Sequence, residues 1–361
     1  MPTLSLGGAE RFISEMSQYL SNESRSHHLI LIEDIITYKK GDNAVLHILY
    51  LNKIIKKIPK LRFLYLLFRL YKVIKIHNIK VLFCGLDSCA KLSYYLKKYI
   101  LTDIILINLC QNNIINKFSK NEREKLLRYY QSSKTIIACS EGVEKSLINS
   151  SVDKNKIHII TNCVKTENKK DFFQNVINNL HSLDNEFKLI TVGSMTPQKN
   201  HLLYIDLIYE LNNLGINCSA GIIGDGILKE KIKNKIKMLN LESKIKLYGW
   251  TDSDKYFNLL SQYHLFVLCS DFEGLPLVML EAMSIGLPIL STDCDSGPRE
   301  ILSNGKYGIL VPIKDKDKLV GGALEIKNKM SYYSGLSYNN VKKYSRDNVG
   351  RKFLKLMDGI A

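Results

Sequence analysis

The stretch DFEGLPLVMLEAMSIGLPILSTDCDSGP, residues 271–298, places two carboxylates eight positions apart around a Gly-Leu-Pro turn signal. The two acids are Glu273 and Glu281. The apolar run at 264–269 predicts a strand before the turn, and the helical apolar pattern at 277–285 predicts a helix after it. The first carboxylate is therefore expected in a loop at the carboxyl end of a strand.

The start of the predicted helix has the features of an anion site. Pro276 suits the first helical turn, where its missing N–H costs nothing. The N–H groups around Leu275 and Leu277 then lack helical partners and point at the opening. Glu281 lies at helical spacing from Gly274 and Leu277, so it faces the same opening. An anion cradle between two carboxylates suits a nucleotide diphosphate sugar, with N–H groups on the phosphate and carboxylates on the hydroxyls.

Length and composition are those of a globular protein of two ordinary domains. The chain has 361 residues, of which 45% are hydrophobic. Basic residues interrupt the apolar stretch at 61–76, so no transmembrane helix is expected, and the sequence shows no signal peptide. The eight cysteines form no C-x-x-C pair, and neither His nor Cys shows the spacing of metal ligands. We expect buried thiols in a reducing cytoplasm.

Positive charge is concentrated in one segment. The chain has a net charge of +16, and residues 39–100 hold 14 Lys or Arg against Asp42 and Asp87. Nucleic acid, an anionic membrane face or an acidic substrate could each explain this excess. A Lys-rich composition that merely keeps the surface soluble is the simpler alternative, but it does not explain why acidic residues avoid this segment.

Strands and helices alternate regularly in the C-terminal half, which predicts an α/β fold with a parallel, doubly wound sheet. The predicted strands are 188–192, 218–223, 244–247, 265–269, 288–291 and 308–311. The predicted helices between them include 201–214, 228–239 and 254–262. Ligands of such sheets bind at the carboxyl ends of the strands.

The N-terminal half alternates in the same way. Its predicted strands are 28–33, 45–49, 81–84, 104–107, 135–138 and 157–160, and its predicted helices are 9–20, 60–76, 88–98, 121–131 and 141–150. The polar stretch 165–185 is interpreted as a linker. We expect an N-terminal domain of residues 1–165, a C-terminal domain of residues 166–344, and a last helix, 345–361, that packs back on the first domain.

The N-terminal domain lacks room for its first strand. Gly7 and Gly8 indicate a tight turn into a helix, and in a doubly wound domain such a turn follows the central strand. At most six residues precede this turn, and Pro2 weakens any central pairing. We expect a gap or a very short strand beside the strand at 81–84, with a natural start upstream of Met1.

The chain resembles the glycosyltransferases of family 4. The motifs that carry the resemblance are GGAER (7–11), TNCVKTE (161–167), VGSMTPQKN (192–200), GDG (224–226), YGW (248–250), FEGLPLVMLEAM (272–283) and SGPREIL (296–302). They extend over about residues 1–313, and the E-x7-E region is the most specific of them. The resemblance implies a GT-B fold, in which two Rossmann-like domains face each other with the donor site in the cleft. It also implies a retaining enzyme that needs no metal or other cofactor.

The resemblance also assigns roles to residues. It implies that Glu281 binds the ribose hydroxyls, Glu273 contacts the donor sugar, and Lys199 lies against the donor diphosphate. Glu273 and Lys199 are the predicted catalytic residues. A freely solvated lysine is the alternative for Lys199. The predicted donor-binding residues are Gly7, Gly8, Ser194, Lys199, Gly224, Asp225, Trp250, Glu273, Gly274, Leu275, Leu277 and Glu281. Trp250 fits a base pocket or the domain core equally well.

The sequence departs from the family pattern at three places. Ser194-Met195 stands where an arginine is expected, which leaves more of the phosphate charge to Lys199 or to a neighbour such as Arg299. Cys163 replaces the glycine of an Asn-Gly pair after Asn162. The loop at 107–113 has no histidine for the sugar, so Gln111 or Asn112 is the expected substitute.

The helix at 60–76 combines apolar and basic residues. It is either a core-packed helix with a lysine face or an interfacial surface that meets anionic lipid and a lipid-linked acceptor. Nucleic-acid binding is disfavoured, because the chain shows no motif of that class.

We expect the protein to transfer a hexose or N-acetylhexosamine from a UDP-linked donor to a lipid-linked glycan or to a lipopolysaccharide or capsule precursor. The expected location is cytoplasmic, peripheral on the inner face of the membrane. A nucleotide-sugar 2-epimerase and an inactive sugar-nucleotide-binding partner protein remain alternatives.

Overall fold

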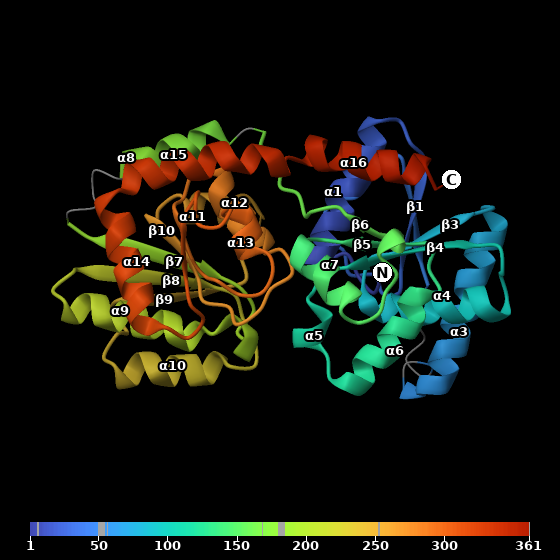
Figure 1. Ribbon diagram of the computed structural model, residues 1–361, viewed down its shortest axis with the longest axis horizontal. Coiled ribbons are helices and arrows are strands. Elements are labelled where there is room, and N and C mark those ends of the chain that lie inside the picture. The colour runs from blue at the N-terminus through green and yellow to red at the C-terminus, as the bar shows by residue number, and fades with distance from the viewer. Residues whose placement is uncertain are drawn as a thin grey trace. The chain divides into compact units, whose positions relative to one another are not determined.

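The computed structural model describes residues 1–5, 7–49, 55, 57–167, 169–179, 185–251 and 253–360. The chain divides into two compact units, Met1–Cys163 with Arg346–Ala361, and Val164–Ser345 (Figure 1). It crosses between them after Cys163 and again after Ser345, close to the boundaries at 165 and 344 that the sequence suggests. The second unit has one parallel sheet, and the first unit has two parallel sheets and two apolar clusters.

The second unit is built on a six-stranded parallel sheet in the order β12-β11-β10-β7-β8-β9. The strands are β7 (Phe187–Val192), β8 (Cys218–Ile223), β9 (Ile245–Gly249), β10 (Leu265–Leu268), β11 (Ile289–Thr292) and β12 (Ile309–Val311). Every residue of β10 and β11 is buried, as expected for strands covered on both faces. The order reverses between β7 and β10, so the loops after these two strands open at a topological switch point.

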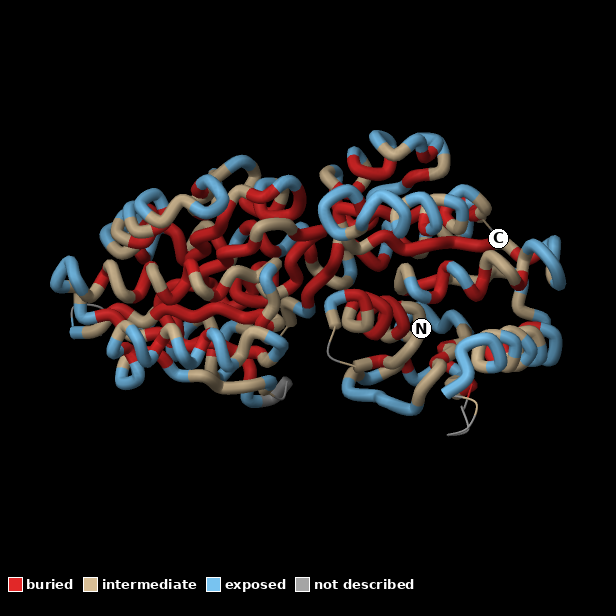
Figure 2. The backbone as a smooth tube through the Cα atoms, turned by 90° about the horizontal axis from the view of Figure 1, so that it is seen from below, coloured by how far each residue is buried: buried red, intermediate tan, exposed pale blue. Residues whose placement is uncertain are grey.

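Helices cover both faces of this sheet. On one face, α9 (His201–Asn213) contacts α10 (Lys229–Met238) and α14 (Lys316–Asn328). On the other, α15 (Met330–Asn340) contacts α8 (Lys170–Asn179) and α12 (Leu277–Ser284) (Figure 1). The shorter helices are η3 (Pro197–Lys199), α11 (Ser253–Leu260), α13 (Pro298–Ile301) and η4 (Val341–Tyr344). Figure 2 shows buried strands at the centre of the unit and exposed residues on the outer turns of its helices.

The prediction of a linker at 165–185 is wrong, because α8 forms within it. Phe173 stacks on Tyr338 with ring centroids 4.1 Å apart, and Val176 is fully buried. Gly286, at φ +79°, leaves room for the Phe173 ring, which a side chain there would meet. The apolar residues of this short segment are spaced as one helix face, and the surrounding Lys, Asn and Gln residues hide that spacing in the sequence.

The first unit contains two separate parallel sheets. The four-stranded sheet has the order β3-β4-β5-β6, and β1 pairs with β2 alone. The strands are β1 (His27–Leu31), β2 (Ala44–Ile48), β3 (Val81–Cys84), β4 (Ile105–Cys110), β5 (Thr135–Ala138) and β6 (Ile157–Ile159). The helices are α1 (Gly8–Asn22), α3 (Pro59–Ile76), α4 (Asp87–Tyr99), α5 (Ile114–Lys117), α6 (Lys120–Gln131), α7 (Glu141–Ile148), η1 (Lys154–Lys156) and α16 (Arg346–Asp358).

Two cores join the separate sheets of this unit. On one face, α1 and α16 pack together, with Phe12 edge-on to Phe353 and Tyr19 against Gly350. On the other face, α3 and α4 cover a second apolar cluster. Leu29 of β1 belongs to the first cluster and Ile30 packs against the second, because successive strand side chains point to opposite faces. All eight cysteines are buried and unbridged, as the sequence indicates.

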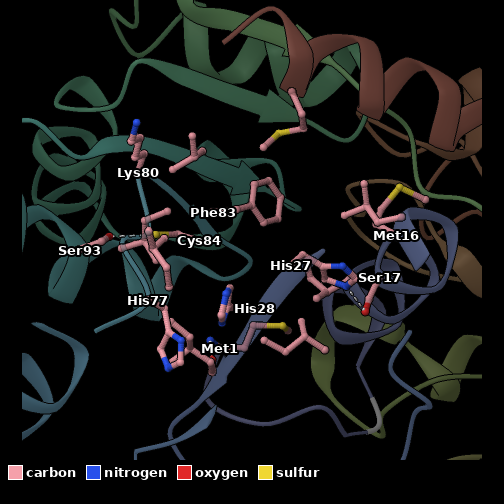
Figure 3. Close-up of a pocket in the computed structure, with 18 of the residues that line it drawn as sticks. Met1, Met16, Ser17, His27, His28, His77, Lys80, Phe83, Cys84 and Ser93 are labelled. Carbon is pink, nitrogen blue, oxygen red and sulfur yellow. Dashed lines mark hydrogen bonds between the residues drawn. The ribbon is translucent and has the colours of Figure 1, made fainter. Parts of the chain in front are cut away.

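A gap separates β1 from β3 at the place where the short N-terminal segment predicts one. Leu4 forms an isolated bridge with Ile36, and none of residues 1–5 belongs to a strand. The amino group of Met1 donates to the carbonyl of Ile30, so the segment runs beside the end of β1 and the residues after it. A cavity of about 520 Å³ lies between β1 and β3, lined mainly by apolar side chains (Figure 3).

No helix within the described ranges is both long and apolar enough to cross a bilayer.

The cavity between β1 and β3 predicts that an added strand will stabilise the protein. An apolar, extended segment of about six to eight residues placed before Met1 would bury several aliphatic side chains, each contributing about 1.5–3 kcal/mol. We expect calorimetry to show a higher melting temperature, by about 2–4 °C for each kcal/mol of net stabilisation. A polar extension of the same length is the control and should change nothing. Equal melting temperatures for the two extensions would show that the cavity does not accept a strand.

Candidate functional site

Glu273 lies in the loop after β10, where short polar side chains fix its position. The hydroxyl of Ser270 donates to Oε1 of Glu273 at 2.7 Å, and the hydroxyl of Ser296 donates to its backbone carbonyl at 2.6 Å. Thr292, at the end of β11, donates to the carbonyl of Ser270 at 2.6 Å. Glu273 is only 6% exposed. The carboxylate is therefore held at the carboxyl edge of the sheet, as the sequence predicts.

Lys199 reaches the same carboxylate from the loop after β7. Its Nζ atom lies 2.5 Å from Oε1 of Glu273. Two hydrogen bonds join the loops: the N–H of Asp271 donates to the carbonyl of Gln198 at 2.9 Å, and Nε2 of Gln198 donates to the carbonyl of Phe272 at 2.8 Å. The lysine side chain is 18% exposed and ion-paired, so it is not freely solvated. The pair spans the switch point between β7 and β10.

The backbone around Lys199 adopts a turn that asparagine tolerates. Asn200 has φ +46°, a left-handed conformation in which asparagine is enriched. Its side chain caps α9 by accepting from the N–H of Leu203 and also donates to Asp271 at 3.3 Å. His201 follows and is 2% exposed. Burial, with a smaller contribution from the charge of Lys199, lowers the pKa of His201 to about 4, so Lys199 is not flanked by a second cation at neutral pH.

Glu281 lies in the second turn of α12 and is buried. It is 3% exposed, and its Oε2 atom accepts a hydrogen bond from the hydroxyl of Tyr256 in α11 at 2.6 Å. Tyr256 is not among the donor-site residues predicted from the sequence. No motif links a tyrosine to an acid 25 positions away, and only the fold brings α11 beside α12. The tyrosine fixes the orientation of the carboxylate before any ligand arrives.

The start of α12 is shaped by a glycine from another loop. Pro276 occupies the N-cap position, one residue earlier than the first-turn position expected from the sequence. Gly297 has φ +87°, and a Cβ atom there would lie 2.6 Å from Cδ of Pro276 and 2.8 Å from the carbonyl of Gly274. The N–H of Met279 donates to the carbonyl of Pro276 at 3.1 Å, whereas the N–H groups of Leu277 and Val278 have no acceptor within the helix. They present partial positive charge at the same edge as Lys199.

Glycines bring the loops after β7 and β8 together. The N–H of Gly193 donates to the carbonyl of Ile223, and the N–H of Met195 donates to the carbonyl of Asp225, both at 2.9 Å. A Cβ atom on Gly224 would lie 2.0 Å from the Gly193 carbonyl, and one on Gly226 would lie 2.7 Å from the Met195 carbonyl. Ser194 lies half-buried between these contacts.

The remaining predicted residues of this unit lie nearer the surface. Asp225 accepts from Lys229 and from the N–H of Gly226, each at 2.7 Å, and these contacts lower the pKa of its carboxyl group. Trp250 follows β9 and is 44% exposed, so the alternative of a core residue is wrong. Arg299 forms a two-pronged ion pair with Asp293, so its charge is already partly neutralised.

The other predicted residues belong to the first unit. Gly7 precedes α1, and a Cβ atom there would lie 2.1 Å from the carboxylate of Glu10, which folds back over the turn. Gly8 is the first residue of α1. Gln111, the expected substitute for the family histidine, donates from Nε2 to Oδ1 of Asn162 at 2.8 Å.

Comparison with known proteins decides the family. The model "Glycosyl transferases group 1" matches residues 172–346, and the model "Glycosyltransferase Family 4" matches residues 6–168. The chain belongs to the family 4 glycosyltransferases. It has the GT-B fold, with two Rossmann-like domains built on parallel sheets, and it is a glycosyltransferase that uses a nucleotide sugar.

Two curated relatives are similar in sequence. One, from Campylobacter jejuni, is the N-acetylgalactosamine-N,N'-diacetylbacillosaminyl-diphospho-undecaprenol 4-alpha-N-acetylgalactosaminyltransferase, 27% identical over 99% of this chain and 98% of that protein. The other, from Escherichia coli, is the UDP-Gal:alpha-D-GlcNAc-diphosphoundecaprenol alpha-1,3-galactosyltransferase, 32% identical over 48% of this chain and 46% of that protein.

A solved structure shares the fold. The Anabaena protein HepE, in complex with UDP-glucose, superposes with a TM-score of 0.81 over 99% of this chain and 98% of that chain, at 14% sequence identity. At that identity, the likeness supports the fold and not the substrate.

The Lys199–Glu273 pair predicts separate effects on binding and turnover. Lys199→Met should weaken donor binding by roughly 10- to 100-fold, because a hydrogen bond to a charged group contributes about 1.5–3 kcal/mol. Glu273→Gln keeps a side chain that can accept from Ser270, and it should lower kcat far more than donor affinity. Lys233→Met, which removes an exposed pair with Glu230, is the control and should leave both unchanged. Parent-like binding and turnover in both site variants would refute the assignment.

The Glu281–Tyr256 hydrogen bond predicts a graded loss of nucleotide affinity. In a calorimetric titration, Glu281→Gln should bind UDP at least roughly tenfold more weakly than the parent does, since the charge on the hydrogen-bond acceptor is lost. Tyr256→Phe should cost a smaller factor, about 2- to 10-fold, because only the orienting hydrogen bond disappears. Tyr263→Phe removes the hydroxyl contact with Tyr248 and is the matched control. A Tyr263→Phe effect as large as that of Tyr256→Phe would show that the loss is not specific to Glu281.

Proposed function

We propose that the protein transfers a hexose or N-acetylhexosamine from a UDP-linked donor to a lipid-linked glycan, with retention of anomeric configuration. The observation that carries the proposal is the Lys199–Glu273 pair at the switch point of the second sheet, with Glu281 on the adjoining helix. Support for UDP comes from the E. coli relative, whose name specifies UDP-Gal.

The second unit supplies groups for each part of such a donor. Glu281, oriented by Tyr256, accepts hydrogen bonds from the ribose hydroxyls. Lys199 and the first N–H groups of α12 neutralise the diphosphate, with Lys199 turning from Glu273 toward the phosphate. Glu273 then accepts hydrogen bonds from the donor sugar. Since the lysine holds the carboxylate before the donor binds, Glu273 is already in place and only the Lys199 side chain has to turn.

The transfer step follows from these positions. The bond between the anomeric carbon and the diphosphate oxygen breaks, and the acceptor oxygen forms a bond on the same face of the sugar. The electron pair of the broken bond goes to the leaving UDP, whose phosphate oxygen takes the proton of the acceptor hydroxyl. Lys199 and the helix N-terminus stabilise the growing negative charge on the diphosphate.

A lipid-linked acceptor agrees with the relatives and with α3. Both curated relatives are named for substrates linked to diphosphoundecaprenol. One side of α3 packs in the core through Leu66, Leu70 and Ile74, as expected for a core-packed helix. Leu61, Leu64 and Phe68 lie on another side and are 45%, 60% and 52% exposed.

The charges on α3 fit an anionic lipid surface. Lys72 lies over the ring of Phe68, with Nζ 4.6 Å from the centroid, and Arg69 lies over the ring of Tyr65. An exposed apolar stripe with adjoining basic residues is typical of a helix that lies on a membrane interface. Lys56, also part of this basic segment, lies outside the described residues.

An assay of turnover separates the candidate functions. The protein is incubated with radiolabelled UDP-sugars, with and without a lipid extract of bacterial membranes. Labelled lipid and UDP release that both depend on the extract support transfer. UDP release without any acceptor would instead indicate a 2-epimerase, and binding without turnover would indicate an inactive binding protein. Either result overturns the proposal.

We expect EDTA to change the rate of transfer by no more than about twofold, because Lys199 and a helix terminus neutralise the phosphate. Loss restored by manganese would contradict that role.

Binding to liposomes tests the membrane-facing helix. The parent should bind vesicles containing phosphatidylglycerol and dissociate as salt increases. Replacing Lys57, Arg62, Arg69 and Lys72 with Gln should abolish that binding. Replacing Lys229, Lys233, Lys235 and Lys237 of α10 removes the same charge elsewhere and is the control. Equal binding by the α3 variant and the parent would leave the basic segment without this role.

A further inference from the structure

Three histidines from three separate elements of the first unit meet in one cluster. His28 lies in β1, His47 in the paired strand β2, and His77 directly follows α3. Their ring centroids are 4.6–5.1 Å apart, and one ligand nitrogen from each falls within 4.8 Å of the others. Figure 3 shows His28 and His77 side by side at the edge of the cavity. Within the described ranges, it is the one group of His, Cys, Asp or Glu side chains close enough to share an ion.

The backbone fixes this grouping. In the β1–β2 register, His28 is opposite Val45 and His47 is opposite Ile30, so the two histidines are diagonal neighbours across the strand pair. Nδ1 of His28 and Nε2 of His47 are 2.8 Å apart and share one proton as a hydrogen bond. Both rings are half-buried, whereas His77 is exposed at the end of its helix. Two ligands are thus anchored in a sheet, and the third has freedom to adjust.

We propose that His28, His47 and His77 bind one divalent transition-metal ion, with Zn²⁺ as the preferred occupant. Three imidazoles with an open fourth position for water match the tetrahedral preference of zinc. Zn–N bonds of about 2.0–2.1 Å place ligand nitrogens about 3.3 Å apart, and a small rotation of the exposed His77 ring brings the cluster to that geometry. The hydrogen bond between His28 and His47 is exchanged for two bonds to the metal.

The charge state of the cluster agrees with metal binding. Burial and the neighbouring histidines lower the pKa of both His28 and His47, which favours the neutral ring that offers a lone pair to a metal. Imidazole ligands suit Zn²⁺, Cu²⁺ and Ni²⁺ and do not suit Mg²⁺. A bound ion would tie β1 and β2 to the end of α3, on the side of the gap where only two strands pair. Its expected role is to stabilise the first unit, apart from the predicted donor residues of the second.

Calorimetric titration of the chelator-treated, full-length protein with zinc chloride tests the site, after removal of any affinity tag. We expect one ion per chain, a higher melting temperature with Zn²⁺, and no change with Mg²⁺. His77→Gln should weaken zinc binding by about tenfold or more, since a ligand is lost. His77 is exposed, so its replacement carries little risk to folding. His158→Gln, an exposed histidine of β6, is the control and should bind as the parent does.

Cobalt distinguishes this site from adventitious binding to thiols. Co²⁺ held by three imidazoles gives weak visible bands, whereas thiolate ligation adds strong charge-transfer absorption near the ultraviolet. Weak bands that disappear in His47→Gln and persist in His158→Gln would support the site. Zinc binding that is equal in His77→Gln and the parent, thiolate absorption, or no stoichiometric binding by the parent would each overturn it.

Discussion

The ion pair between Lys199 and Glu273 is the interaction on which the proposed donor site depends. It joins the loops after β7 and β10, the two strands between which the order of the second sheet reverses. A buried charge is costly unless it is paired, so each residue requires the other in the absence of ligand. The same two charges suit the phosphate and the hydroxyls of a nucleotide sugar. The requirement for stability and the proposed role in binding therefore select the same geometry.

The two units differ in how completely their sheets are formed. In the second unit, six strands pair without interruption, and loops joined by hydrogen bonds hold the site at their carboxyl ends. In the first unit, a cavity lies between β1 and β3, and packing by α1, α16, α3 and α4 joins the separate sheets. The proposed donor contacts of Lys199, Glu273 and Glu281 thus lie on the continuous sheet, and the histidine cluster lies beside the interrupted one.

The sequence predicts most of the fold and part of the site. Strands 81–84, 135–138 and 218–223 match the structure residue for residue, because apolar runs bounded by turn residues leave little choice. Local patterns also place Glu273 at the carboxyl end of a strand, where ligands of such sheets bind, whereas Lys199 is assigned to the donor site only by the family resemblance. Local patterns cannot predict the contact of Tyr256 or the cluster of His28, His47 and His77, because these partners are distant in sequence and only tertiary packing brings them together. The helix α8 is not recognisable in the sequence for another reason: polar residues surround its few apolar ones, so its helical spacing does not stand out.

A crystal structure of the protein with UDP would show directly which groups hold the nucleotide. We expect the ribose hydroxyls to donate to Glu281, the diphosphate to lie at the start of α12, and Nζ of Lys199 to have moved from Glu273 to a phosphate oxygen. A diphosphate bound away from α12, with the Lys199–Glu273 pair unchanged, would contradict the proposed donor site.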